Sequence, residues 1–491
     1  MTAGWPAALL GPGAALDQAV ERDAVQVVRG LGDGPAAGGR VLDPRAEARL
    51  GLVEARLEAG EREPVEAREG GHQLGRHRRG GRQLAGDRVV GHETDLSPAL
   101  ALLAAHPLLR RAAPHLEGDV SVVGGAVRDA LLGRPAGPEL DLVVEGDALA
   151  LARRLGRDLG GRVFAHPRFG TAAVELPHGQ HLDVVTARRE TYPRPGALPE
   201  VAPGTLADDL ARRDFTINAV ALRLSGDGAG ALVDPHGGVA DAEAGIVRTL
   251  RADAFEEDPS RLVRAARYAA RLGFLLDGDT SAAARQAAPD LDPGSARVAD
   301  ELTRLAQEPT APSALALLGS LGVPWLSRPR DAGLRERFTA LDEALARPGA
   351  PEIPAWPLRL GEALDPDTLA GTAVPGWARA LGAVARAGAA LAERLGAGAA
   401  PSEVDRLLRA APPATAVGAL SHGAEAVAGW WAHGRDREPA VRGADLVSAG
   451  IPPGPAIGRA LATVRAALLD GRVGGPDDQL ALAQRVAREG R

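Results

Sequence analysis

Two short segments of the sequence carry residue types suited to binding phosphate and a divalent cation. In the first, an apolar run that begins at Asp119 ends at Gly124 and Gly125. Glycine has no Cβ, so the backbone N–H groups of paired glycines can approach an anionic ligand closely. In the second, Glu139 and Asp141 are separated by one residue of an apolar run. Because strand side chains alternate between faces, both carboxylates are predicted to lie on one face and to bind Mg²⁺ together.

A third acidic residue, Asp183, lies in the alternating segment Leu182-Asp183-Val184-Val185. This alternation predicts a half-buried strand that is able to pair with the strand of Glu139 and Asp141. Taken alone, such an aspartate is an ordinary residue at the edge of a strand. Its significance depends on the other motifs of the chain.

The triplet Arg212-Arg213-Asp214 precedes an apolar run that contains Asn218. A guanidinium group can bind a phosphate in bidentate fashion, and a carboxylate can accept a hydrogen bond from a ribose hydroxyl. Isolated triplets of this kind are usually surface charges. The apolar residues that follow this one indicate that it is anchored beside a core.

The segment from Glu257 predicts the start of a helix, with Asp258 as its cap and Pro259 at its first position. Asp258, Arg261 and Arg264 then recur every three residues and share one helix face. The alternative interpretation of this pattern is a capped helix that carries an ordinary i, i+3 salt bridge.

In this order, these segments resemble the bacterial-type tRNA nucleotidyltransferase/poly(A) polymerase family, the class II CCA-adding enzymes with their CC-adding and A-adding members. The resemblance is strong over residues 95–310 and implies the polymerase β-like nucleotidyltransferase fold. It also implies template-independent addition of C and/or A residues to the 3′ end of tRNA. CTP and/or ATP would be the substrates and two Mg²⁺ ions the cofactors. The family usually carries Asp-x-Asp where this chain has Glu139 and Asp141.

The resemblance also implies a role for each matching residue. Glu139 and Asp141 would hold the two Mg²⁺ ions, and Asp183 would help to deprotonate or orient the attacking 3′-hydroxyl. The helix after Glu257 would present a Watson–Crick-like edge to the incoming base. The residues expected to bind the nucleotide are Gly124, Gly125, Arg128, Arg212, Arg213, Asp214, Asn218, Glu257, Asp258, Arg261 and Arg264. For Arg128, an ion pair with Asp129 at the start of a helix is the local alternative.

Several activities remain compatible with these motifs. The chain could be a complete CCA-adding enzyme, a partial enzyme that adds only CC or only A, or a poly(A) polymerase. A non-catalytic RNA-binding relative is a further alternative, because Glu139 replaces the usual aspartate. Residues Arg189 to Leu210 lie where the family has a flexible loop that is implicated in switching from C to A.

Composition places limits on the chemistry and on the number of domains. At 491 residues the chain should hold several domains, and its net charge of −7 means that any basic surface for RNA must be local. The absence of cysteine excludes disulfides and thiolate metal sites. No apolar run reaches the length of a membrane span, so we expect a cytoplasmic protein without a membrane partner. The sequence carries no signal for an oligomeric state.

We expect an α/β head followed by an all-α neck, body and tail. Residues 1–94 show no sustained periodicity and predict a disordered extension or a non-native upstream segment. A basic arm that contacts RNA through Arg76, Arg78, Arg79 and Arg82 is the alternative for this region. The head is expected over 95–225, the helical neck with the base-recognition helix over 226–310, and the body and tail that bind tRNA over 311–491.

Patterning predicts the elements that must position the head residues. A helix is expected over 96–113 and another over 147–159. Strands are expected over 119–123, 139–144, 162–165, 171–176 and 181–186. The glycines between 226 and 230 predict a break, after which helices dominate.

Overall fold

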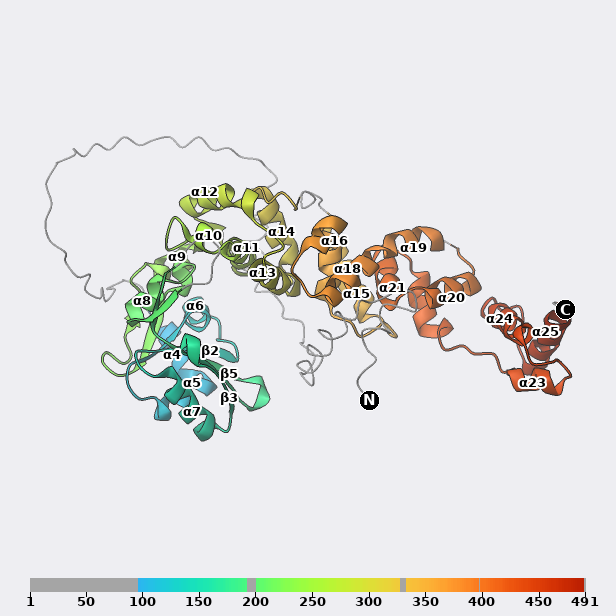
Figure 1. Ribbon diagram of the computed structural model, residues 1–491, viewed down its shortest axis with the longest axis horizontal. Coiled ribbons are helices and arrows are strands. Elements are labelled where there is room, and N and C mark those ends of the chain that lie inside the picture. Colours follow the sequence, from blue (N-terminus) through green and yellow to red (C-terminus); the bar gives the residue numbers. More distant parts are fainter. Residues whose placement is uncertain (1–95, 192–199, 327–332, 397, 490–491) are drawn as a thin grey trace. The chain divides into compact units, whose positions relative to one another are not determined.

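The computed structural model describes residues 96–191, 200–326, 333–396 and 398–489. These described residues form two compact units (Figure 1). The first holds the residues up to Asp292 and Ser320–Pro324, and the second holds Pro293–Gly319 and the chain from Trp325 onward. The predictions for residues 1–94, including the basic arm, lie outside the described residues.

The first unit is built on a seven-stranded sheet with the order β3-β4-β5-β2-β1-β8-β9. Only β2 and β5 pair in parallel, and the other neighbouring strands are antiparallel. The strands are β1 (Val120–Val123), β2 (Glu139–Val144), β3 (Arg162–His166), β4 (Thr171–Glu175), β5 (His181–Thr186), β8 (Ala221–Ser225) and β9 (Leu232–Val233). The expected strands at the head are therefore confirmed, each within about two residues of its predicted ends.

The sheet buries two different apolar surfaces. One face packs on α4 (Ser97–Ala105), α5 (Pro107–Ala112), α6 (Gly125–Leu131) and α7 (Ala148–Leu159), and it receives Leu140 and Leu142 from β2. The other face carries a smaller cluster beneath α8 (Leu206–Ala211), which contains Leu206 and Leu210 together with Val143 of β2. Each fully buried leucine contributes roughly 1.5–3 kcal/mol. Alternation along β2 therefore turns Asp141 toward the second face, away from the main core.

One expected helix is two helices in the structure. The prediction of a single helix over 96–113 is wrong, because α4 ends at Ala105 and α5 begins at Pro107. The ring of Pro107 disfavours helical backbone at the residue before it, and His106 is extended, with φ −63° and ψ 122°. The helix expected over 147–159 is confirmed as α7, and Asp147 caps it by accepting a hydrogen bond from the Ala150 N–H.

The segment from Arg189 to Leu210 contains regular structure where a flexible loop was expected. β6 (Arg188–Thr191) pairs antiparallel with β7 (Glu200–Pro203), and residues 192–199 between them lie outside the described residues. α8 follows, and it starts with a capping box in which Thr205 and Asp208 each bind the backbone of the other.

The boundary expected after residue 225 falls inside the sheet. The glycines at 226, 228 and 230 have φ values of +78°, +71° and +87°, in the left-handed region that favours glycine. They form the turn of a hairpin between β8 and β9, so the sheet continues to Val233. After this hairpin the first unit is mainly helical, with α9 (Gly238–Ala244), α10 (Ala254–Glu257), α11 (Ser260–Leu272) and α12 (Gly278–Ala287).

The described remainder of the chain is helical, as expected. It begins with α13 (Ala296–Gln307) and α14 (Ala311–Ser320). One apolar cluster joins α15 (Leu334–Ala346), α16 (Ala355–Ala363), α18 (Gly376–Arg386), α19 (Gly388–Leu395), α20 (Pro401–Ala410) and α21 (Pro413–Ser421). A second joins α23 (Gly443–Ser448), α24 (Pro455–Leu469) and α25 (Pro476–Glu489). None of the helices in the described part of the chain has the length and apolar character that a membrane crossing requires.

Candidate active site

The pairing of β2 with β5 brings two of the three predicted carboxylates together. Asp141 is aligned with Asp183, and Glu139 is aligned with His181. Neighbouring strands are about 4.8 Å apart, so Asp141 and Asp183 lie side by side on one face. Nε2 of His181 is 3.0 Å from Oδ1 of Asp183. Among the residues that the structure describes, no group of three or more His, Cys, Asp or Glu side chains is already arranged as a metal site.

The carboxylate of Asp141 is crowded by other charged groups although it remains exposed to solvent. Loss of hydration raises the pKa of Asp141, Arg213 opposes this effect, and the negative charges of Asp183 and Glu139 raise the pKa further. A cluster in which carboxylates repel one another is an environment that a hard cation relieves. The oxygen donors on this face are therefore of the kind that a hard divalent cation prefers.

Gly124 occupies a position where no other residue fits without strain. Its φ is +71°, and a Cβ added there would lie 3.2 Å from Oδ2 of Asp141 and 3.0 Å from Nη1 of Arg213. The missing side chain thus allows the turn between β1 and α6 to pass directly beside the carboxylate and the guanidinium. The glycine turn therefore adjoins the strand that carries Asp141.

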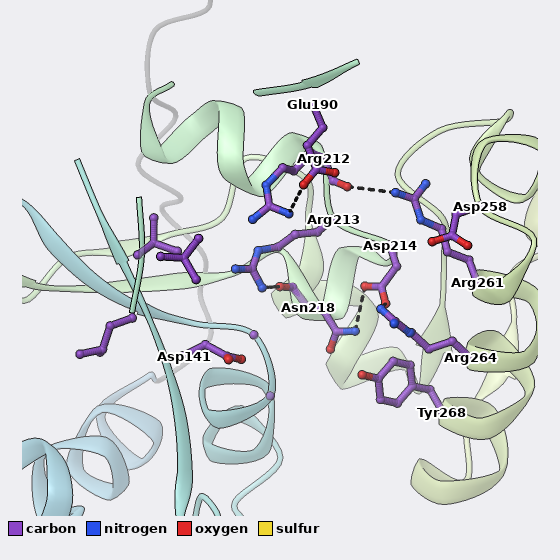
Figure 2. Close-up of a pocket in the computed structure, with 15 residues that line it drawn as sticks. Asp141, Glu190, Arg212, Arg213, Asp214, Asn218, Asp258, Arg261, Arg264 and Tyr268 are labelled. Atoms are coloured by element: carbon purple, nitrogen blue, oxygen red, sulfur yellow. Dashed lines mark hydrogen bonds and ion pairs between the residues drawn. The ribbon is translucent and has the colours of Figure 1, made fainter. Parts of the chain in front are cut away.

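A cavity of about 360 Å³ opens beside this turn, and Figure 2 shows side chains converging on it from β2, from the segment after α8 and from α11. Its lining includes ten of the residues expected from the sequence: Gly124, Gly125, Asp141, Arg212, Arg213, Asp214, Asn218, Asp258, Arg261 and Arg264. The lining does not include four other expected residues, which are Glu139, Asp183, Arg128 and Glu257.

Arg212 and Arg213 are held by a buried aspartate that sequence reasoning missed. Asp209 accepts from Nε of Arg212 at 3.0 Å through Oδ1, and from Nη2 of Arg213 at 3.1 Å through Oδ2. Glu190, also missed, lines the cavity and accepts from Nη1 of Arg212 at 3.1 Å. Asp209 precedes the two arginines by three and four residues, a helical spacing that is the available signal in the sequence. Glu190 has no comparable signal.

Asn218 links Arg128 and Asp214, which lie far apart in the sequence. Its Oδ1 accepts from Nη1 of Arg128 at 2.8 Å, and its Nδ2 donates to Oδ1 of Asp214 at 3.0 Å. Arg128 also donates to Asp129 at 2.9 Å and 2.8 Å. This buried guanidinium forms the local ion pair with Asp129 and does not line the cavity, while its role at the triphosphate stays a prediction.

Asp214 is fully engaged by protein donors. Besides Asn218, it accepts from the Phe215 N–H at 2.8 Å and from Nη1 of Arg264 at 3.1 Å. Burial acts to raise the pKa of Asp214, but the charge of Arg264 and these hydrogen bonds outweigh it and hold the pKa below its ordinary value. Asp214 is therefore an anion that positions Arg264 at the cavity.

The start of α11 brings acidic and basic groups to the cavity together (Figure 2). Oδ1 of Asp258 accepts from the N–H of Ser260 at 3.1 Å and from its Oγ at 2.6 Å, as expected of a cap. The helix begins at Ser260, one residue later than predicted, although Pro259 already has helical φ and ψ. Arg261, which lines the cavity, donates to Oε2 of Glu257 at 3.1 Å. Glu257 itself is not part of the lining and contacts it through Arg261.

Tyr268 is a further lining residue that sequence reasoning missed. It lies one helical turn beyond Arg264, so extending the three-residue pattern of α11 by four residues would have found it. Its ring packs edge-on against Phe215, with centroids 5.8 Å apart, and Arg128 lies 5.2 Å from its centroid. Tyr268 therefore connects α11 to Arg128, the residue that donates to Asn218.

Comparisons with known proteins identify relatives of the chain. A sequence profile described as the poly(A) polymerase head domain matches residues 120–248. A CC-adding tRNA nucleotidyltransferase of Deinococcus radiodurans is 40% identical over 383 residues, which cover 76% of this chain and 90% of that relative. An A-adding tRNA nucleotidyltransferase of Halalkalibacterium halodurans is 42% identical over 189 residues, which cover 38% of this chain and 44% of that relative. A solved CCA-adding enzyme in an apo form has a TM-score of 0.66 at 25% identity and is matched over 79% of this chain and 98% of its own.

Proposed function

We propose that this chain adds the two C residues that precede the terminal A of tRNA. The chain belongs to the tRNA nucleotidyltransferase/poly(A) polymerase family and is a tRNA nucleotidyltransferase. The observation that carries this proposal is the extent of the likeness to the CC-adding relative, which reaches 90% of that relative's length. The likeness to the A-adding relative covers 44% of its length. Addition of A is the second candidate, since the head matches that relative at 42% identity.

We infer that Glu139 and Asp141 hold two Mg²⁺ ions and that Asp183 orients the attacking 3′-hydroxyl and accepts its proton. Support comes from the alignment of Asp141 with Asp183 and from the raised pKa of Asp141. The chemistry that bound Mg²⁺ supplies is activation of the hydroxyl and neutralisation of charge on the triphosphate. His181, 3.0 Å from Asp183, would keep that carboxylate fixed in orientation.

The triphosphate would bind between the Gly124–Gly125 turn and Arg213, with Arg212 nearby. Arg213 lines the cavity, and its Nη1 lies beside the Gly124 turn. A guanidinium at this place can donate to the phosphate oxygens of a nucleotide. Asp209 fixes both guanidinium groups before the nucleotide binds, so these side chains lose little conformational entropy on binding.

The base would be read by the start of α11. An exocyclic amine, which cytosine and adenine share, can donate to the Asp258 carboxylate, while Arg261 or Arg264 donates to the adjacent acceptor of the base. Glu257 and Asp214 position these two arginines. We further infer that the residues after β9, up to residue 310, form the neck that carries this helix and that residues 311–491 bind the tRNA body.

The test uses the full-length protein with Mg²⁺, radiolabelled CTP or ATP, and three tRNAs that lack CCA, CA or only the terminal A. The CC-adding proposal predicts C incorporation into the first two tRNAs and no A incorporation into the third. A incorporation into the third tRNA alone would support the second candidate, and completion of CCA on all three would identify a full CCA-adding enzyme. Long A tracts would identify a poly(A) polymerase. Binding of tRNA without any incorporation would show a non-catalytic relative.

A further inference from the structure

The sheet face that carries the proposed catalytic carboxylates extends beyond the cavity, across β4 and β3. Directly paired residues project from the same face of a sheet. Asp141 pairs with Asp183, Asp183 with Ala173, and Ala173 with Phe164. These four residues therefore form one row across four strands, which we call the carboxylate row. The neighbours of the row along β4 and β5, such as Ala172, Val174 and Leu182, point to the opposite face and belong to the main core.

Part of this face is left accessible. The small cluster beneath α8 covers the face at Val123, Val143 and Ala221, on β1, β2 and β8. Over β3 the side chains of Arg162, Phe164 and His166 are exposed. Phe164 keeps 40% of its surface in contact with solvent, which is unusual for a phenylalanine in a strand.

The exposed ring at the end of the carboxylate row is accompanied by positive charge. The guanidinium of Arg162 lies 5.3 Å from the centroid of the Phe164 ring, and His166 projects from the same face two residues further on. Glu175 pairs with Arg162 in the neighbouring row, so the charge at that row is mixed. An aromatic ring beside arginine is the combination that stacks unpaired bases and holds the adjoining phosphates.

The spacing of the strands places this ring near the reacting end of a bound RNA. Phe164 is two strands from Asp183, a separation of about 10 Å at about 4.8 Å per strand. Stacked nucleotides advance about 3.4 Å each, so the ring lies within about three nucleotides of a 3′-hydroxyl held at Asp183. Ala173, the residue between them in the row, is small and only half-buried, which leaves room above the sheet along this path.

We propose that Phe164, flanked by Arg162 and His166, is a binding site for the unpaired 3′ end of the substrate RNA and stacks on a base close to the attacking hydroxyl. This inference rests on the proposed function, because it takes the carboxylate row as the place where that hydroxyl reacts. The row leads from the cavity to the ring, and the ring lies beside the guanidinium of Arg162; this combination of aromatic ring and arginine favours a single RNA strand as the occupant.

The variant Phe164→Leu tests the proposal, because leucine keeps an apolar side chain and loses the ring. We expect the KM for tRNA to rise about 10-fold, as loss of one base–aromatic stack implies, with the KM for CTP unchanged. Phe164→Trp keeps an aromatic ring, so its KM for tRNA should stay close to the wild-type value. Phe169→Leu is the matched control, since Phe169 is also 40% exposed and has Arg168 5.6 Å from its centroid but lies outside the four-strand rows.

A second measurement does not require turnover. A tRNA with 5-iodouridine at its unpaired 3′ nucleotide is irradiated in complex with the full-length protein, and the cross-linked peptide is identified by mass spectrometry. We expect the cross-link within β3, and we expect Phe164→Leu to abolish it.

An unchanged KM for tRNA in Phe164→Leu, equal effects of Phe164→Leu and Phe169→Leu, or a cross-link only outside β3 would each overturn the inference. In all three cases incorporation by the wild-type protein would leave the proposed function standing. Conversely, a wild-type protein that cross-links through Phe164 but incorporates no nucleotide would overturn the proposed function and keep this site.

Discussion

Asp141 is the side chain at which the proposed cation-binding and phosphate-binding parts of the site meet. Its strand neighbour is Asp183, and its Oδ2 lies beside the Gly124 turn and the guanidinium of Arg213. Removing the charge of Asp141 therefore alters the carboxylate cluster and the electrostatic balance of Arg213 together.

We predict that Asp141→Asn lowers kcat for C incorporation by at least about 100-fold, because an amide cannot supply the charge that divalent cations need. Binding of tRNA should stay within about twofold of the wild-type value, since the charge lost lies in the nucleotide site. The measurement is single-turnover incorporation together with a filter-binding titration. Glu145→Gln is the matched control, because Glu145 directly follows β2 and does not line the cavity. Full activity in Asp141→Asn would contradict the assignment.

Asp209 gives a second prediction that concerns single side chains. Asp209→Asn should raise the KM for CTP about 10-fold with a smaller effect on kcat, because Arg212 and Arg213 lose the anion that orients them. Asp208→Asn controls for damage to α8 itself, since Asp208 belongs to the capping box of the same helix. A rise in KM of equal size in both variants would indicate that Asp209 acts through the stability of the helix and not by positioning the arginines.

The start of α11 shows how one element combines stability with recognition. Asp258 caps the helix through Ser260 and also lines the cavity, so a single carboxylate fixes the end of the helix and is available for the proposed contact with the base. Arg261 anchors the same helix end to the preceding segment through the backbone oxygen of Arg212, at 3.2 Å. The side chains proposed to read the base are thereby fixed relative to the arginines proposed to bind phosphate.

We predict that Asp258→Ala destabilises the protein by about 1 kcal/mol, the usual cost of a lost cap. It should also reduce discrimination of CTP against UTP by about 10-fold or more, because the acceptor for the exocyclic amine is gone. Competition assays with the two nucleotides measure the ratio. Asp147→Ala, which removes the cap of α7, should cost similar stability and leave the nucleotide preference unchanged. Equal discrimination in wild type and Asp258→Ala would remove Asp258 from base recognition.

For the molecule as a whole, we expect the free energy of unfolding at low pH to depend on a buried cluster around Asp405 in the second unit. Asp405 of α20 accepts from Arg465 of α24, from Arg409 and from the indole N–H of Trp430. Burial acts to raise the pKa of Asp405, but these hydrogen bonds outweigh it and lower the pKa to about 2. Because the pKa is lower in the folded protein than in the unfolded chain, protonation favours unfolding.

The contribution of Asp405 is therefore complete near neutral pH and is lost as the pH falls from about 4 toward about 2. We predict that it amounts to about 2 kcal/mol and that Asp405→Asn loses it already at pH 7, with a shallower decline below pH 4. Tryptophan fluorescence during urea unfolding reports on this unit, because the five tryptophans of the described residues all lie in it. The exposed Asp436→Asn should follow the wild-type pH profile. Parallel profiles for Asp405→Asn and the wild type would contradict this prediction.

The local sequence determined much of the fold and most of the candidate site. Alternation set Glu139, Asp141 and Asp183 on strands, paired glycines marked the turn, and Asp258 marked a helix start. These signals are readable because they depend on backbone geometry within a few residues. The same local rules fail where two signals compete, as at Pro107, which ended a helix that apolar patterning alone had extended.

Tertiary structure alone decided which of these residues meet. The pairing of β2 with β5 aligned Asp141 with Asp183 across 42 positions of sequence, and the path of the chain after α8 brought Arg213 to the Gly124 turn. Packing also moved Arg128 behind Asn218 and brought Glu190 and Tyr268 into the lining. Contacts of this kind depend on burial and on partners distant in the chain. Residue type and spacing therefore specify the chemistry that the chain can supply, and the register of the sheet decides which side chains supply it together.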